Sequence, residues 1–419
     1  MRLRDRIVDQ AQRIPNHTCV ETVERGRYQR VPEQAGQSCD RILARRKQPN
    51  FARMSHLESS DRLRLDVLVT RDHEIYSWAG AGHFEEGEID ELVHQGAMGT
   101  GEFAVLLESI FDTRPQRFAF DGETTLNGRK VYEYSFQIPR QESRYRYKDP
   151  TQPWTPTGYG GTLLVDPKTA GLARFTVHTD ELPPSSNGCE VDTTLDYGSV
   201  QLSGTEFLIP VATRQRFISR DGTEAENSYA FSACRDFQAE SQVKFGEAPP
   251  SADAGVKPSR KAPAALPAGL AVSIDLTTPL DSDKSAAGDR IEGSLAAPIL
   301  TSHGAVLIAA GTRVAGRLMR VEVEHLSPRR VTFVLHWETV EARGASEPLA
   351  LVPNRKVKQP GIQFGGIAAL PAAIIELRKC GQCIELPRPD EEQFAILHFP
   401  GEHHVTGIGI RTEWLTTTP

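Results

Sequence analysis

The stretch DRLRLDVLV, residues 61–69, decides the fold, because its apolar side chains recur at every second position. Those positions are Leu63, Leu65, Val67 and Val69. A period of two places one set of side chains on one face of a β-strand. The stretch YEYSFQI, residues 132–138, repeats this spacing with aromatic and apolar side chains. Both stretches predict strands of an antiparallel sheet with one buried face.

Turn signals separate further strands in the first part of the chain. LLVDPKTAGLARFTV, residues 163–177, is typical of a hairpin around a Pro/Gly loop, and Ser203-Gly204 and Asp221-Gly222 indicate two more turns. Helical spacing of apolar residues occurs at residues 3–14 and again near residues 89–111. We therefore expect a long antiparallel meander whose apolar face is covered by a few helices.

A segment rich in Pro, Ala and Ser, EAPPSADAGVKPSRKAPAAL, occupies residues 247–266 and predicts a flexible linker. It divides the chain into a first domain at residues 1–246 and a second domain at residues 267–419, in which short strands follow one another closely. The predicted fold class is mainly β. The first domain is expected to be α+β, with a curled antiparallel sheet and a few helices, and the second a small β-barrel or sandwich.

The 419 residues carry a formal net charge of −7, and 39% of them are hydrophobic. This balance is typical of a globular protein and offers no broad basic surface for nucleic acid. Since no run of about 20 apolar residues occurs, we expect no transmembrane helix. The first residues, MRLRDRIVDQAQRIP, lack the apolar core of a signal peptide.

The chain contains 6 cysteines, four in the first domain and two in the second, so each domain can pair its own. In RKCGQCIELP, residues 378–387, Gly381-Gln382 fits a two-residue hairpin loop between extended stretches. Cys380 and Cys383 would then face each other at about 5.5 Å between Cα atoms, which permits a disulfide or two packed thiols. A redox motif or a zinc ligand pair is the alternative, although neither a helix start nor two further ligands accompany the motif.

Other motifs favour structural roles. GTGEFA, residues 99–104, has dinucleotide-site spacing but follows no buried parallel strand, so we expect a glycine loop before a helix. DSDKSAAGDRIE, residues 281–292, has calcium-loop spacing but Ala286 where the turn needs glycine, which favours a polar connection between strands. His403 and His404 have no identifiable metal partner. With no GxSxG or HExxH motif, the sequence predicts no catalytic, cofactor-binding or metal-binding residue and no enzyme.

Several segments of the first domain occur in an order that resembles a family of uncharacterised secreted bacterial proteins. They are RIPNHTCVETVERGRYQR (residues 13–30), DRLRLDVLV, HEIYSWAGAGHFE, GTGEFAVLLESIF, LLVDPKTAGLARF and LDYGSV. The resemblance implies an exported protein, periplasmic or extracellular, and favours a disulfide between Cys19 and Cys39. The expected layout is also similar to LolA-type lipoprotein carriers, in which a curled antiparallel sheet half closes over helices around an apolar cavity.

Residues 266–318 resemble the small β-barrel at the C-terminus of TrbI-type components of conjugation and type IV secretion channels. The likeness lies in the PAG at residues 267–269, in Gly288-Asp289, and in the AGT at residues 310–312 followed by Gly316. No transmembrane anchor precedes this segment in the sequence. The resemblance therefore implies a fold and a role in envelope contacts, and not channel function.

Together these features predict a non-enzymatic exported protein of the cell envelope. We expect its first domain to hold a lipid or acyl chain between sheet and helices, lined by Leu65, Val67, Trp78, Phe103 and Leu107. In the alternative interpretation the same residues fill a closed core. A structural or interaction module that contacts envelope proteins through exposed aromatic side chains or an open strand edge is the second hypothesis. A hydrolase of unknown type is the third.

Overall fold

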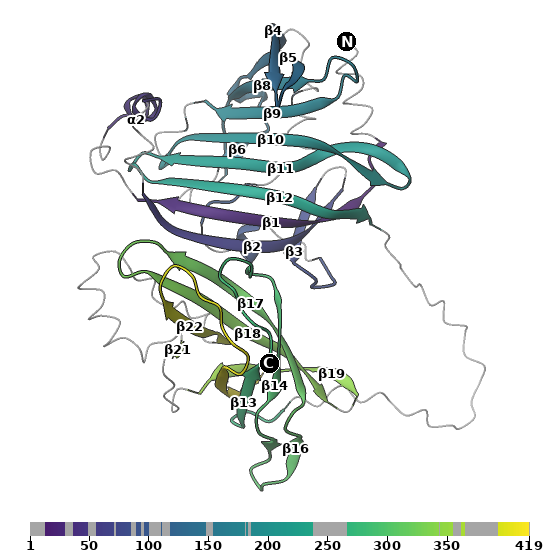
Figure 1. Ribbon diagram of the computed structural model, residues 1–419, viewed down its shortest axis with the longest axis vertical. Coiled ribbons are helices and arrows are strands. Elements are labelled where there is room, and N and C mark those ends of the chain that lie inside the picture. Colours follow the sequence, from purple (N-terminus) through teal and green to yellow (C-terminus); the bar gives the residue numbers. More distant parts are fainter. Residues whose placement is uncertain are drawn as a thin grey trace, which may run out of the picture.

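The computed structural model describes residues 13–29, 37–48, 56–70, 73–84, 89–93, 96–99, 110, 118–147, 154–180, 182, 186–237, 266–342, 344–354, 362–364 and 393–418. In this part of the chain, strands dominate and helices are few. Figure 1 shows two groups of strands stacked along the long axis, which we call the amino-terminal half and the carboxy-terminal half.

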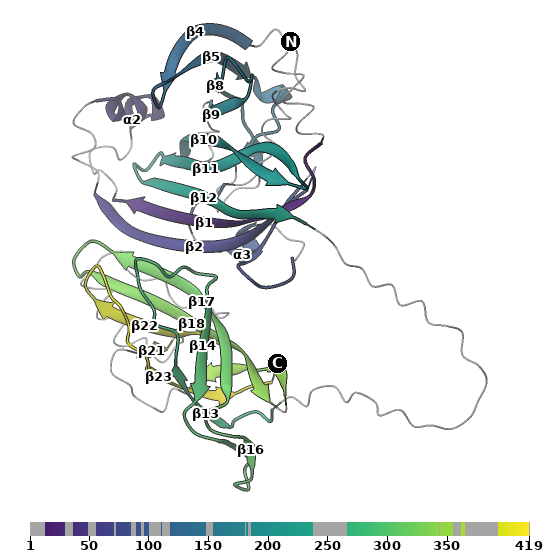
Figure 2. The ribbon, with the colours of Figure 1, turned by 45° about the vertical axis from the view of Figure 1, so that its right-hand side comes forward.

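The amino-terminal half contains strands β1–β12, the helices α2 (Cys39–Arg46) and α3 (Ile89–Leu92), and a 3₁₀ turn, η4 (Arg140–Glu142). Its strands are β1 (His17–Tyr28), β2 (Leu57–Val69), β3 (Glu74–Trp78), β4 (Phe118–Leu126), β5 (Arg129–Ile138), β6 (Arg146–Tyr147), β7 (Thr155–Pro156), β8 (Tyr159–Val165), β9 (Leu172–Thr179), β10 (Gly188–Leu202), β11 (Thr205–Ser219) and β12 (Glu224–Asp236). All the strand pairs of this half are antiparallel, in the spatial order β3-β2-β1-β12-β11-β10-β9-β8-β5-β4, with β6 and β7 as a separate hairpin. Figure 2 shows how strongly this sheet curls.

Local sequence explains the turns and the buried face of this sheet. The four alternating positions of β2 are all buried, as the period of two predicts. Hairpin turns occur at Ser203-Gly204 and Asp221-Gly222, where both glycines have positive φ, and β8 and β9 form the predicted hairpin. The predicted helix at residues 3–14 lies almost wholly outside the described residues. Of the stretch 89–111 the described part is α3, residues 93 and 96–99, and Ile110, which is buried in the core.

The carboxy-terminal half contains strands β13–β23. They are β13 (Ala271–Leu276), β14 (Arg290–Leu295), β15 (Ile299–Leu300), β16 (Val306–Ile308), β17 (Arg313–Glu324), β18 (Arg330–Ala342), β19 (Ala345–Pro348), β20 (Leu351–Pro353), β21 (Ile362–Phe364), β22 (Ala395–Pro400) and β23 (Arg411–Thr416). The main sheet runs β20-β23-β13-β14-β17-β18-β22-β21, with β19 also on β18, around a core that includes the fully buried Trp337 and Trp414.

The mainly β fold class is confirmed, with antiparallel sheets and few helices. The described strands of the carboxy-terminal half, however, do not close into a barrel. The two terminal strands of this sheet, β20 and β21, each pair with a single neighbour among the described strands, so the sheet stays open. The predicted linker at 247–266 lies, apart from Leu266, outside the described residues, and the domain boundaries stay predictions. In the described part of the chain, no helix has the length and apolar character needed to cross a membrane.

Candidate functional site

The predicted apolar lining residues of β2 lie in the core of the amino-terminal half. Leu65 and Val67 are fully buried, and Trp78 on β3, which is half-buried, pairs with Leu65 across the two strands. Phe103 and Leu107 lie outside the described residues. The structure therefore brings three of the five predicted residues together, and their role as a ligand lining stays a prediction.

The packing around Leu65 draws on both halves. Leu65 belongs to a cluster of buried side chains from β1, β2, β12, the α3 region and the carboxy-terminal half: Val23, Leu63, Leu65, Ile89, Val93, Tyr229 and Ala287. Ala287 reaches this cluster through a parallel bridge to Leu63. This part of the predicted lining thus also forms the contact between the halves.

The glycine motif at residues 99–104 has a packing role at its first position. The Gly99 backbone N–H donates to the hydroxyl of Tyr229 at 3.1 Å, and that hydroxyl donates to Gln215 Oε1 at 2.9 Å. A Cβ on Gly99 would lie 2.0 Å from Gln215 Nε2, so a side chain here would collide with a buried amide. The strands that carry Gln215 and Tyr229 are antiparallel, which does not fit the βαβ unit of a dinucleotide site.

Two disulfides join distant parts of the amino-terminal half. Cys19 on β1 bonds to Cys234 on the neighbouring β12, 215 residues away, and Cys39 bonds to Cys189 on β10, 150 residues away. The expected Cys19–Cys39 pairing is therefore wrong. The reason is topological. β1 lies between β2 and β12, which brings Cys19 next to Cys234, while Cys39 at the start of α2 meets Cys189 at the start of β10. Each described cysteine is paired inside its own half, which the distribution of cysteines in the sequence permits, and Cys380 and Cys383 lie outside the described residues.

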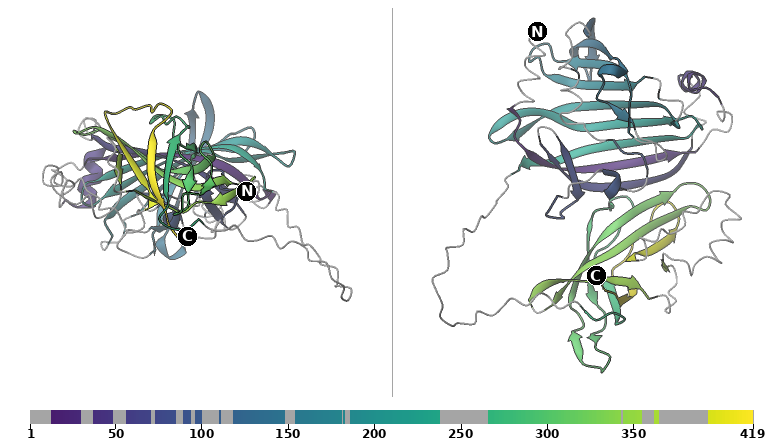
Figure 3. Two further views of the ribbon diagram at one scale, coloured as in Figure 1. Left: turned by 90° about the horizontal axis from the view of Figure 1, so that it is seen from below. Right: turned by 180° about the vertical axis from the view of Figure 1, so that it is seen from behind.

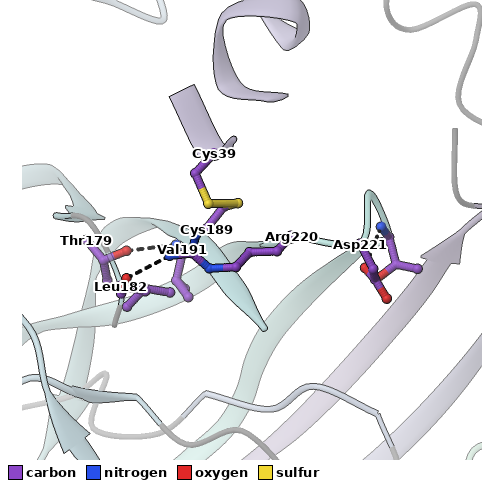
Figure 4. Close-up of a disulfide and its surroundings, with 8 residues drawn as sticks. Cys39, Thr179, Leu182, Cys189, Val191, Arg220 and Asp221 are labelled. Carbon is purple, nitrogen blue, oxygen red and sulfur yellow. Dashed lines mark hydrogen bonds between the residues drawn. A yellow bond between two sulfur atoms is a disulfide. The ribbon is translucent and has the colours of Figure 1, made fainter. Parts of the chain in front are cut away.

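Figure 4 shows the Cys39–Cys189 disulfide, which fastens the start of α2 to the sheet. Ile42 of α2 is fully buried and packs in one cluster with the two cysteines and Ile218. At the other end of the helix, the Arg46 guanidinium forms an ion pair with Glu224 on β12. α2 was not predicted from the sequence, because its eight residues have too few apolar positions for a periodic pattern.

Two carboxylates with perturbed pKa values lie beside this helix. Burial, together with the negative charge of Asp192, raises the pKa of Glu190 to about 7, and burial also raises the pKa of Asp192. Asp192 lies opposite His178 of β9 and opposite Arg216 of β11. The pair can hold a proton near neutral pH, and the neighbouring basic side chains favour its charged form. This pair was not predicted from the sequence; the available signal was the i and i+2 spacing, which places two residues of a strand on one face.

A second polar cluster joins two loops of the carboxy-terminal half. Asp281 and Asp283, between β13 and β14, lie 3.5 and 3.4 Å from Nε2 of His403, which follows β22. These residues supply the partners that the sequence did not identify for His403. The segment 281–292 leads from β13 into β14, and the side chains of Asp289 and Glu292 pair with arginines.

The halves are joined through β2. Residues Ser59–Asp61 of this strand pair antiparallel with Glu322–Glu324 of β17, whereas residues Leu65–Val69 pair with β3 on the same edge. Just beyond β17, the backbone N–H of His325 donates to the carbonyl of Glu58 at 2.9 Å. One hydrogen-bonded sheet therefore continues from one half into the other, as Figure 3 shows from behind.

A buried arginine holds this junction. The guanidinium of Arg317 donates to the carbonyl oxygens of Gly288 at 2.6 Å and Ala79 at 2.7 Å, which belong to different halves. Gly288 has a φ of +100°, and a Cβ there would lie 2.1 Å from the carbonyl oxygen of Arg64 on β2. The Arg64 side chain in turn pairs with Asp289. Glycine at 288 thus permits the close approach of the two halves.

The opposite edge of the amino-terminal sheet carries one exposed aromatic ring, Phe120, beside two half-buried tyrosine rings. Among the described strands, β4 pairs only with β5, which leaves its outer edge open. The side chain of Phe120 on β4 is 59% exposed, and its ring centroid lies 5.7 Å from that of Tyr132 and 5.2 Å from that of Tyr134 on β5. These three rings form what we call the aromatic edge.

The comparisons with known proteins show no family for this chain. No family model and no curated protein matches the chain. The chain is similar to one solved structure, the crystal structure of a DUF1329 family protein from Desulfovibrio piger, at 10% sequence identity and a TM-score of 0.25. The match covers 59% of this chain and 92% of that one. These findings do not support the LolA-type or TrbI-type resemblance.

Proposed function

We propose that this chain is a non-enzymatic exported protein of the cell envelope and that it acts as an interaction module. Two disulfides closing long loops support export, because such bonds form and persist in oxidising compartments such as the bacterial periplasm. The hydrogen-bonded junction between the halves supports a scaffold that presents its surfaces in a fixed arrangement.

The observation that carries the proposal is the aromatic edge. Aromatic rings are enriched at the centres of protein interfaces because they bury much apolar area with few rotatable bonds. The register shift between Phe120 and Gly122 of β4 is a bulge, and bulges and charged side chains discourage the addition of another strand. Recognition would therefore use the faces of Phe120, Tyr132 and Tyr134 more than backbone pairing.

A pull-down from envelope extracts tests this function with matched variants. The unaltered chain is expected to retain a defined envelope protein, and Phe120→Ser is expected to reduce its recovery at least about tenfold. Val306→Ser, which removes an exposed apolar side chain from β16, is the control and should leave recovery unchanged. Equal recovery with both variants, or no partner for the unaltered chain, would argue against the proposal.

Binding of a lipid or acyl chain in the amino-terminal half is the second candidate. It is supported by the continuity of the apolar layer along β2, where Tyr76 and Phe231 pack against both the cluster of Leu65 and that of Val67. Native mass spectrometry of gently purified protein tests it. A co-purified mass that disappears after delipidation supports binding, and a bare chain mass contradicts it.

A further inference from the structure

The polar cluster between the loops after β13 and β22 has the geometry of a metal site. Nε2 of His403 lies 3.5 Å from Oδ1 of Asp281 and 3.4 Å from Oδ2 of Asp283, and the three atoms all lie within 4.8 Å of one another. These separations exceed ordinary hydrogen-bond lengths, which end near about 3.2 Å for nitrogen donors. The three ligand atoms thus lie close together, while His403 is too far from either carboxylate for a hydrogen bond of normal length.

The spacing distinguishes between coordination geometries. Zinc bonds of about 2.1 Å to nitrogen and oxygen place neighbouring ligand atoms about 3.4 Å apart at tetrahedral angles, and about 3.0 Å apart at right angles. The two measured edges from His403 match the tetrahedral value. One imidazole and two carboxylates also form a donor set that suits Zn²⁺ better than Mg²⁺, which prefers oxygen ligands in an octahedron.

The backbone holds the two loops together without any ion. Asp281 forms an isolated antiparallel bridge with Val405, and the Ser282 N–H donates to the His404 carbonyl at 3.1 Å. In the other direction, the His404 N–H donates to Ser282 Oγ, also at 3.1 Å. The ligand-bearing positions are therefore fixed relative to one another before a metal arrives, which lowers the cost of ordering a site.

Other contacts leave the site open to a metal. Lys284 Nζ bonds to Oδ2 of Asp281 at 2.8 Å, which leaves Oδ1 facing His403. The Asp283 N–H donates to that Oδ1 at 2.9 Å and so orients it, as outer hydrogen bonds orient metal ligands. A groove of about 530 Å³, lined in part by Asp281, Ser285 and Val405, lies beside the cluster and has room for a water molecule.

We propose that Asp281, Asp283 and His403 bind Zn²⁺, with water as a fourth ligand. The ion would tie the connection between β13 and β14 to the loop after β22. This site is independent of the aromatic edge and of the function proposed above.

Zinc titration of the full chain by calorimetry tests the proposal, in a background carrying Cys380→Ser and Cys383→Ser so that the CxxC cannot bind the metal. After chelator treatment, we expect one Zn²⁺ per chain. His403→Ala and Asp283→Asn should each weaken binding about 100-fold or more, since each removes one of three protein ligands. His303→Ala, an exposed histidine of the same half, is the control and should change affinity less than about twofold.

Two further measurements separate loss of metal binding from loss of folding and identify the ligand atoms. The melting temperature of His403→Ala without metal should equal that of the background protein, because the side chain is exposed. Co²⁺ bound at the site should show ligand-field absorption without a thiolate charge-transfer band. Failure of the folded background protein to bind Zn²⁺, or equal affinity in His403→Ala, would overturn the assignment.

Discussion

The disulfide pairing allows a direct test of the contact between β1 and β12 in the amino-terminal half. The perturbation is the double substitution Cys19→Ser with Cys234→Ser, which removes the bond between β1 and β12 and leaves the Cys39–Cys189 bond intact. The amino-terminal half is expected to stay folded but to lose a constraint on its unfolded chain.

The expected decrease in the free energy of unfolding depends on how the two disulfide loops are nested. Because Cys39–Cys189 lies inside the loop closed by Cys19–Cys234, the released loop consists of about 20 residues on one side and about 45 on the other. The chain-entropy relation for about 65 residues gives about 4 kcal/mol. Removal of both bonds should cost about 9 kcal/mol on the same relation, enough to unfold most domains of this size.

Hydrogen exchange measures this loss locally, which avoids assuming that both halves unfold together. A cost of about 4 kcal/mol corresponds to protection factors about 10³ lower in peptides from β1 and β12. Peptides from β18 and β22 serve as the internal control and should change little. Unchanged protection in β1 and β12 would refute the reasoning, as would a maleimide label on Cys39 instead of Cys234 in the single variant Cys19→Ser.

Three further outcomes are expected. Arg317→Met should cost about 1–3 kcal/mol and speed hydrogen exchange at the β2–β17 pairing, because it leaves the buried carbonyl of Gly288 and the part-buried carbonyl of Ala79 without their charged donor; normal exchange there would contradict the role given to this side chain. Gly288→Ala should cost at least about 2 kcal/mol in a denaturant titration, since positive φ is combined with a clash against the Arg64 carbonyl. Because the pKa of Glu190 is raised from 4.5 to about 7, its neutral form stabilises the fold below pH 4.5 and this contribution is lost as the pH rises to about 7. Glu190→Gln should therefore raise the melting temperature at pH 8 and leave that at pH 4 nearly unchanged.

Local patterns predicted the strands well, because each depends on neighbours in sequence. The alternation at residues 61–69 gave the buried face of β2, and Ser203-Gly204 gave the turn between β10 and β11. The candidate site was harder to predict. His403 is separated from Asp281 by more than a hundred residues, and only the pairing of the flanking loops brings them together.

The amino-acid sequence by itself determined the antiparallel β architecture, the positions of several hairpins and the supply of cysteines for disulfides. These depend on a period of two and on turn chemistry, which act within a few residues. Only the tertiary structure decided which cysteines bond and that β2 carries both β3 and β17 on one edge. It also decided that Leu65 packs in one cluster with Ala287 of the other half. The physical reason is that strand order and the docking of edges are set by the packing of surfaces far apart in the chain, which no local pattern records.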